Sequence, residues 1–135
     1  MISLLILFFG MFWESSMDII GDERNYSKSI WKSLANYFDK KGKYSFGNQF
    51  WDNSVSWANK WKNKDPKQGE LFIGSSTIFV TFMDGWHLVK FVWVIHIFAA
   101  IVFYSPITDY LIIDILLYYL IYGIGHEVFS RLIRD

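Results

Sequence analysis

The stretch that decides the fold consists of two apolar runs, LVKFVWVIHIFAAIVFY at residues 88–104 and YLIIDILLYYLIYGIG at residues 110–125. The short sequence SPITD, at residues 105–109, joins them as a tight corner. Each run is close to the roughly 20 apolar residues that a helix needs to cross a membrane. Allowing for less apolar residues at their ends, we predict two membrane-spanning helices at about 76–104 and 107–125. Together they would form a transmembrane hairpin.

The composition also favours an integral membrane protein with an all-α fold. Hydrophobic residues make up 53% of the chain and aromatic residues 21%, and aromatic rings are enriched where a membrane meets water. The chain contains no cysteine, which excludes disulfides, thiolate metal ligands and cysteine nucleophiles. With 135 residues, it is expected to form a single membrane domain.

The amino terminus supplies a third apolar segment. Residues 1–13 are apolar but short, and the segment reaches a spanning length only when it is extended to about residue 20. This extension takes in two acidic residues, Glu14 and Asp18. We predict a first span at about 2–20, with an uncleaved anchor or a re-entrant helix as the alternative.

Residues 21–70 form a polar, basic segment. Ten of the thirteen Lys and Arg residues lie in it, against six Asp and Glu residues. A basic segment rich in tryptophan beside apolar spans predicts contact with the bilayer and with anionic lipid headgroups. No recognition motif accompanies the charge, so no nucleic-acid partner is expected.

One or two interfacial amphipathic helices are predicted within residues 26–64. The apolar stripe of the first is Ile30, Trp31, Leu34, Tyr37 and Phe38, at helical spacing. The aromatic face of the second includes Phe50, Trp51, Trp57 and Trp61, with Lys60, Lys62 and Lys64 beside it. Such helices lie in the headgroup plane; the alternative is that these rings pack against the protein itself.

The distribution of Lys and Arg predicts the orientation. Segment 21–70 is basic and the tail at 126–135 contains Arg131 and Arg134, whereas the amino terminus and the 105–109 corner carry no Lys or Arg. By the positive-inside rule, the basic parts and the carboxy terminus face the cytoplasm and the amino terminus lies outside. We therefore predict a multi-pass protein of the plasma (inner) membrane.

Three motifs suggest a relationship. The run Ser56–Glu70, followed by GSSTIF at 74–79 and DGWHLVK at 84–90, resembles a family of small uncharacterised bacterial and phage membrane proteins. The similarity covers roughly residues 50–90. It implies a membrane location and carries no activity over to this chain.

Two ionisable residues lie deep in the predicted hairpin. His96 is about nine residues before the corner and Asp114 about nine residues after the start of the corner, so both are expected about 13 Å from the outer end at helical rise. A charge at this depth usually faces a polar group or a protein interior. We predict a His96–Asp114 contact; the alternative is that each faces another subunit or a different polar group.

More ionisable residues are expected together at the inner membrane level. Candidates for catalysis are Asp84, His87, His126 and Glu127, and candidates for metal binding are His87, His126, Asp84, Glu14 and Asp18. Imidazole and carboxylate groups could bind a divalent metal and activate water. The alternative is that these residues make structural polar contacts, and no cofactor is predicted.

The first functional interpretation is a non-enzymatic subunit or scaffold in a membrane complex or homo-oligomer, because three spans with this many aromatic residues leave large apolar faces. The partners would be other membrane subunits or further copies of the chain. One alternative is an oligomeric pore of the holin or toxin type. Another is a small metal-dependent enzyme that acts on lipid at the inner interface.

Overall fold

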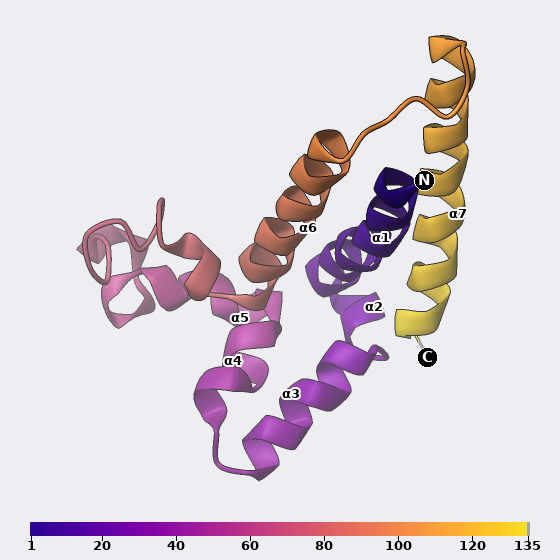
Figure 1. The fold of residues 1–135 in the computed structure, drawn as a ribbon. Coiled ribbons are helices and arrows are strands. Elements are labelled where there is room, and N and C mark those ends of the chain that lie inside the picture. The colour runs from indigo at the N-terminus through magenta and orange to yellow at the C-terminus, as the bar shows by residue number, and fades with distance from the viewer. Residues whose placement is uncertain (135) are drawn as a thin grey trace.

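The computed structural model describes residues 1–134, apart from the side chain of Tyr44, and every regular element in this part of the chain is helical. Three helices are long and apolar enough to cross a membrane: α1 (Ile2–Gly21), α6 (Gly85–Val102) and α7 (Leu111–Arg134) (Figure 1). Their lengths of 18 to 24 residues correspond to about 27–36 Å. The predicted all-helical fold with three apolar helices is confirmed.

Helix α1 lies between α6 and α7, which both pack against it and barely contact each other (Figure 1). Small residues permit the close approach. A Cβ atom at Gly10 would lie 3.0 Å from the Cβ of His96 in α6, and one at Gly125 in α7 would lie 2.9 Å from the Cγ of Met11. The two helices of the predicted hairpin are thus adjacent in sequence but separated in space by α1.

The bundle has two different ends. At the closed end, the end of α1, the start of α6 and the end of α7 meet the short helices of residues 22–60. At the open end, the start of α1 lies between the end of α6 and the start of α7, and the extended connection 103–110 joins the last two (Figure 1).

Helix α6 begins nine residues later than the predicted start at residue 76. Asp84 caps it, because the Asp84 carboxylate accepts a hydrogen bond from the His87 backbone N–H at 2.8 Å, as an N-cap residue does. The preceding residues form turns and the 3₁₀ helix η5 (Val80–Phe82). The prediction of one helix over 76–104 is therefore wrong in its first third.

Helix α7 is displaced toward the carboxy terminus relative to the predicted 107–125. It begins at Leu111, because the carboxylate of Asp114 binds the backbone of the preceding connection and holds that connection out of the helix. It continues to Arg134, and the buried Ser130 and Ile133 extend its packed face beyond residue 125. The predicted polar tail is therefore helical up to the last described residue.

The predicted interfacial segment contains one amphipathic helix and a series of short turns. The helix is α3 (Ile30–Lys40), capped by the side chain of Ser29, which accepts from the Lys32 N–H. The second predicted helix is broken into short pieces at the Asp52 cap. The short elements are α2 (Glu23–Tyr26), η1 (Tyr44–Phe46), α4 (Asn48–Trp51), α5 (Asn53–Ser56), η2 (Trp57–Lys60), η3 (Lys62–Lys64) and η4 (Pro66–Gln68).

An aromatic and aliphatic core fills the closed end. Trp31 of α3 stacks on Trp51 of α4 with ring centroids 4.7 Å apart. Gly85 faces Trp51 so closely that a Cβ there would lie 2.4 Å from its ring. The buried members of this core are Ile19, Ile20, Tyr26, Trp31, Ala35, Phe50, Trp51, Val89 and Ile133. It joins all three long helices to α3 and α4.

Some aromatic rings of residues 26–64 are buried in the protein core, and others are exposed on its surface. Trp31, Phe50 and Trp51 are buried, as the alternative interpretation expected, whereas Trp57 is 45% exposed. On α3, Ile30, Leu34 and Tyr37 are also exposed. One part of the predicted stripe therefore packs on the core, and the other part faces away from the protein.

Candidate functional site

The first candidate group is a carboxylate–imidazole pair at the start of α6. Nδ1 of His87 lies 2.9 and 2.8 Å from the two carboxylate oxygens of Asp84. A carboxylate only accepts, so Nδ1 carries the hydrogen and Nε2 is the basic nitrogen of the neutral ring. The Asp84 side chain is 1% exposed and that of His87 is 27% exposed. This arrangement fixes the tautomer of the ring and leaves one nitrogen for a further contact.

The spacing along the chain explains this pair. Asp84 occupies the N-cap position and His87 lies three residues later, where an N-cap side chain reaches the helix backbone. The same carboxylate thus receives both the backbone N–H and the ring of His87. The main structural role of the Asp84 carboxylate is to cap the start of α6, and it contacts the imidazole of His87 from the same position.

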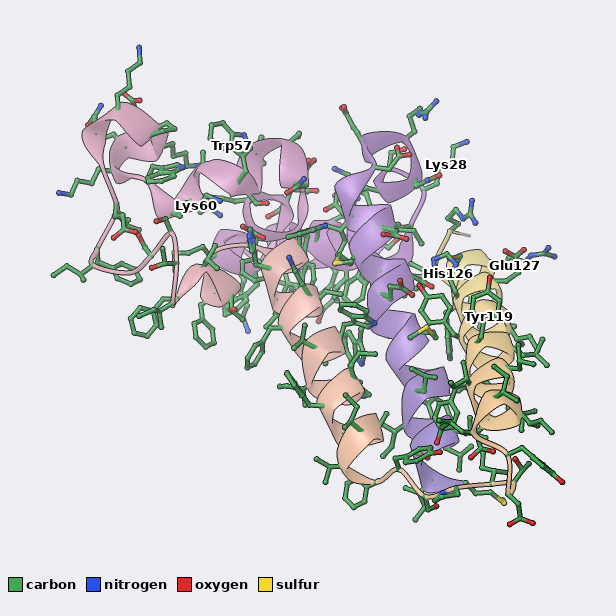
Figure 2. The ribbon with its side chains drawn as sticks, turned by 90° about the horizontal axis from the view of Figure 1, so that it is seen from above. Lys28, Trp57, Lys60, Tyr119, His126 and Glu127 are labelled. Carbon is green, nitrogen blue, oxygen red and sulfur yellow. The ribbon has the colours of Figure 1, made fainter. Side chains whose placement is uncertain are left out.

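A second pair bridges α1 and α7 near the closed end. Nε2 of His126 lies 3.2 Å from a carboxylate oxygen of Asp18, with the side chains 35% and 60% exposed. Ser15 donates to the backbone carbonyl of His126 at 3.1 Å. Glu127, on the next position of α7 (Figure 2), instead forms an exposed pair with Arg131 at 2.6 Å. Exposed ion pairs of this kind contribute little to stability.

Glu14 joins this α1–α7 contact from inside. One carboxylate oxygen accepts a hydrogen bond from the hydroxyl of Tyr122, while the other is buried and has no hydrogen-bond partner among residues 1–134. The tyrosine partner was not predicted. Its position one helical turn before His126 on α7 is the signal that could have indicated it, because residues four apart share a helix face.

The residues predicted to lie together at the inner membrane level include two separate histidine–carboxylate pairs. Asp84 pairs with His87 within the start of α6, whereas Asp18 pairs with His126 across the contact between α1 and α7. Within residues 1–134, no three His, Asp or Glu side chains come together in a way that could hold a metal ion. The five residues predicted as metal ligands therefore do not form a single site in this structure.

His96 and Asp114 have separate partners. Nδ1 of His96 donates to the Val92 carbonyl at 2.8 Å, and its ring lies 6.3 Å from that of Trp13 in α1. No hydrogen bond joins His96 to Asp114 in the described part of the chain. The predicted intramembrane contact is not formed, because α1 lies between the helices that carry the two residues.

Asp114 instead organises the connection at the open end. Its carboxylate accepts from the backbone N–H groups of Ile107 and Thr108 at 3.0 and 2.9 Å. It also accepts from the hydroxyls of Tyr104 and Thr108 at 3.1 and 2.9 Å. Four donors satisfy a residue that is only 1% exposed, as a buried carboxylate requires.

An apolar groove of about 430 Å³ adjoins Asp114. All three long helices contribute to its walls, with Leu7 from α1, Ala100 from α6 and Tyr118 from α7. It follows from the arrangement of the helices, since α6 and α7 approach α1 from different sides and leave a space at the open end. A hydrocarbon chain or an apolar helix face has the chemistry to fill it.

A polar network outside the predicted candidates connects α3 with α4. The side chain of Asn48 accepts from Lys32 Nζ at 2.7 Å and donates to Asp39 at 2.6 Å. The hydroxyl of Tyr26 also reaches Asn48, and burial is the main cause that raises the pKa of Tyr26, with Asp52 and Asp39 adding to it. All of these groups bind one another, so the network is structural.

Comparisons with known proteins identify no relative of this chain. No protein-family model matches the chain, and neither a search of curated proteins nor a search of solved structures finds a match.

Proposed function

We propose that this chain is a non-enzymatic, multi-pass subunit or scaffold of a membrane assembly, in which α1, α6 and α7 span the bilayer. The observation that carries the proposal is the separation of α6 from α7 by α1, which leaves most of their apolar surface uncovered. Phe98 and Ile101 of α6 are each 64% exposed, and Tyr119 of α7 is 75% exposed. In water such faces would be unfavourable; in a bilayer they fit lipid and neighbouring helices.

The groove at the open end favours a partner helix as the occupant. It has an apolar lining from three helices, and it lies within the apolar part of the bundle. Helices in membranes associate by close packing of shape-complementary faces. Another subunit or a second copy of the chain would supply the helix. The polar side chains of the open end form hydrogen bonds with one another. A partner helix would therefore bind in the groove by apolar packing.

The orientation belongs to the same proposal. The basic residues of α2, α3 and residues 60–67 all lie at the closed end, and the 103–110 connection at the open end has no Lys or Arg. This distribution supports a cytoplasmic closed end and an external amino terminus in a plasma (inner) membrane. Anionic headgroups would then face the basic segment.

The test is the mass of the protein extracted from its native membrane in mild detergent. A complex of fixed stoichiometry, with other chains or with copies of this one, is expected. Ile101→Trp, which narrows the groove, should weaken that complex, whereas Phe98→Trp, a change at an equally exposed site outside the groove, should leave it intact. A monomer for all three proteins would contradict the proposal.

A second candidate function, a lipid-directed enzyme, rests on the Asp84–His87 pair. A carboxylate that holds Nδ1 and leaves Nε2 free is the arrangement of a general base. Phospholipid hydrolysis by purified protein, lost in His87→Gln and retained in the control His126→Gln, would favour it. Absence of hydrolysis by the wild-type protein would contradict this candidate.

A further inference from the structure

Residues 71–82, here named the apolar loop, expose large hydrophobic side chains without forming a long helix. Ile73 is 93% exposed, Ile78 is 78% exposed and Phe82 is 64% exposed. Leu71, Phe72 and Phe79 are each more than two-fifths exposed. Single exposed hydrophobic residues are common, but a contiguous apolar patch marks an interaction surface.

Hydrogen bonds inside the loop give it a defined shape. The carboxylate of Glu70 accepts from the Gly74 N–H at 2.8 Å, from the Ser76 N–H at 3.2 Å and from the Ser76 hydroxyl. The buried Ser75 donates to the Lys60 carbonyl at 2.8 Å. Gly74 has a φ of +84°, which favours glycine. Glu70, Ser75 and Ser76 therefore form hydrogen bonds within the protein, while the large apolar side chains remain exposed.

The apolar loop is attached to a turn that carries exposed lysines. Backbone hydrogen bonds join Leu71 to Lys60 at 2.9 Å and Lys62 to Gly69 at 3.0 Å, so the two segments run side by side. Lys62, Lys64 and Lys67 are exposed on this turn. Positive charge beside an apolar surface is the pattern of proteins that bind anionic membranes.

The loop is also fixed beside the start of α6. The side chain of Asn59 donates to the carbonyls of Gln49 and Met83 at 2.8 and 2.9 Å, which ties the turn region to the residue before the Asp84 cap. In Figure 2, the segment containing Trp57 and Lys60 lies at the level of this end of α6 and extends away from α1 and α7. The end of the loop, η5, packs against α6 and leads directly into it.

We propose that the apolar loop inserts into the cytoplasmic leaflet beside α6, while Lys62, Lys64 and Lys67 bind anionic phospholipid headgroups. The occupant of this surface is the bilayer itself, on three grounds: the large exposed side chains are apolar, the adjacent turn carries three exposed lysines, and the loop leads directly into the proposed span α6. The inference rests on the membrane placement of α6 in the proposed function. It adds a second, non-spanning site of lipid contact.

The absence of cysteine allows a direct test with single nitroxide labels. Full-length Ile73→Cys and Ile78→Cys variants would be labelled and reconstituted in vesicles of phosphatidylcholine and phosphatidylglycerol. Accessibility to oxygen, which concentrates in the bilayer, would be compared with accessibility to a water-soluble nickel chelate. We expect severalfold less nickel accessibility at 73 and 78 than at Lys67→Cys, and greater oxygen accessibility.

A label at Phe98→Cys separates this inference from the proposed function. Suppose that the nickel chelate reaches positions 73 and 78 as readily as position 67, while position 98 is shielded from it. That result would overturn insertion of the loop and leave the proposed spanning helices in place. Exposure of position 98 to nickel would overturn the membrane placement itself. Shielding of 73 and 78 from both reagents would indicate cover by a protein partner and would also overturn the inference.

The lysines have a matched control. Replacing Lys62, Lys64 and Lys67 with Gln should raise nickel accessibility at position 73 in anionic vesicles. Replacing Lys40, Lys41 and Lys43, which lie at the far end of α3, removes the same charge elsewhere and should have no effect. Equal results for the two triple variants would contradict the role of the lysines as headgroup ligands.

Discussion

The closed and open ends of the bundle are held together in different ways. At the closed end, stacked Trp31 and Trp51 and their neighbours form a shared core that contacts all three long helices. At the open end, the connection between α6 and α7 depends on the hydrogen bonds of Asp114, and an apolar groove remains beside it. The closed end is therefore stabilised by packing within the chain, whereas the open end keeps an unfilled apolar groove.

The strongest test of this comparison is Trp51→Ala. The side chain is 8% exposed and fills the space between Trp31 and Gly85. Its loss should lower the free energy of unfolding by about 3–5 kcal/mol, as for other buried tryptophans. Denaturation in detergent micelles measures this. Trp57→Ala, at a site 45% exposed, should change it by no more than about 0.5 kcal/mol; similar losses would mean that the closed-end core has no special role.

A substitution at Gly125 tests the packing of α1 against α7. In Gly125→Ala, the new Cβ would lie 2.9 Å from Met11 Cγ and 3.1 Å from Met11 Cβ, so the helices must shift. Overpacking of this kind costs about 1–3 kcal/mol. Gly123→Ala has nothing within 4 Å and should be stabilising, by up to about 1 kcal/mol, because alanine favours helix. Thermal unfolding of both variants in detergent would reveal a difference of sign.

Asp114→Asn should act locally at the open end. The amide of asparagine keeps one accepting oxygen, but its NH₂ group cannot accept from the N–H groups of Ile107 and Thr108. The hydrogen bond that is lost should lower the free energy of unfolding by about 1–2 kcal/mol. Hydrogen exchange of these two amides should accelerate while the closed end stays protected. Asp109→Asn is the control, since that carboxylate is exposed. Equal loss of protection at the closed end would show that the two ends are not independent.

The smallest effect concerns the apolar loop and its dependence on pH. Hydrogen bonds from Ser76 and Gly74 lower the pKa of Glu70 from its ordinary 4.5. The ionised Glu70 carboxylate stabilises the shape of the apolar loop. This stabilisation is fully present above the ordinary pKa of Glu70, and it is lost as the pH falls through the lower pKa that Glu70 has in the folded loop. A nitroxide at Ile73→Cys should be less mobile at pH 7 than at pH 3.

The control for this titration is Glu70→Gln in the same labelled chain. The amide cannot titrate, and it provides fewer acceptors for the N–H groups of Gly74 and Ser76. The label should then be mobile at both pH values. A pH response that persists in the glutamine variant would show that a group other than Glu70 titrates.

Local patterns in the sequence determined a large part of the fold. The apolar runs at 2–20, 88–104 and 110–125 are long enough to predict three apolar helices without any tertiary contact. The pairing of Asp84 with His87 could also be foreseen, because it depends only on a spacing of three residues at the start of a helix. The helix boundaries were less predictable, since caps by Asp84 and the Asp114 contact decide them.

The order of the helices in space was decided by tertiary structure alone. Hydropathy does not indicate which apolar helix lies between the others; the close approach at Gly10 and Gly125 places α1 there. That arrangement separates His96 from Asp114, brings Tyr122 to Glu14 and His126 to Asp18, and leaves the groove open. Sequence spacing predicts contacts within one helix, but contacts between helices depend on which faces of them meet.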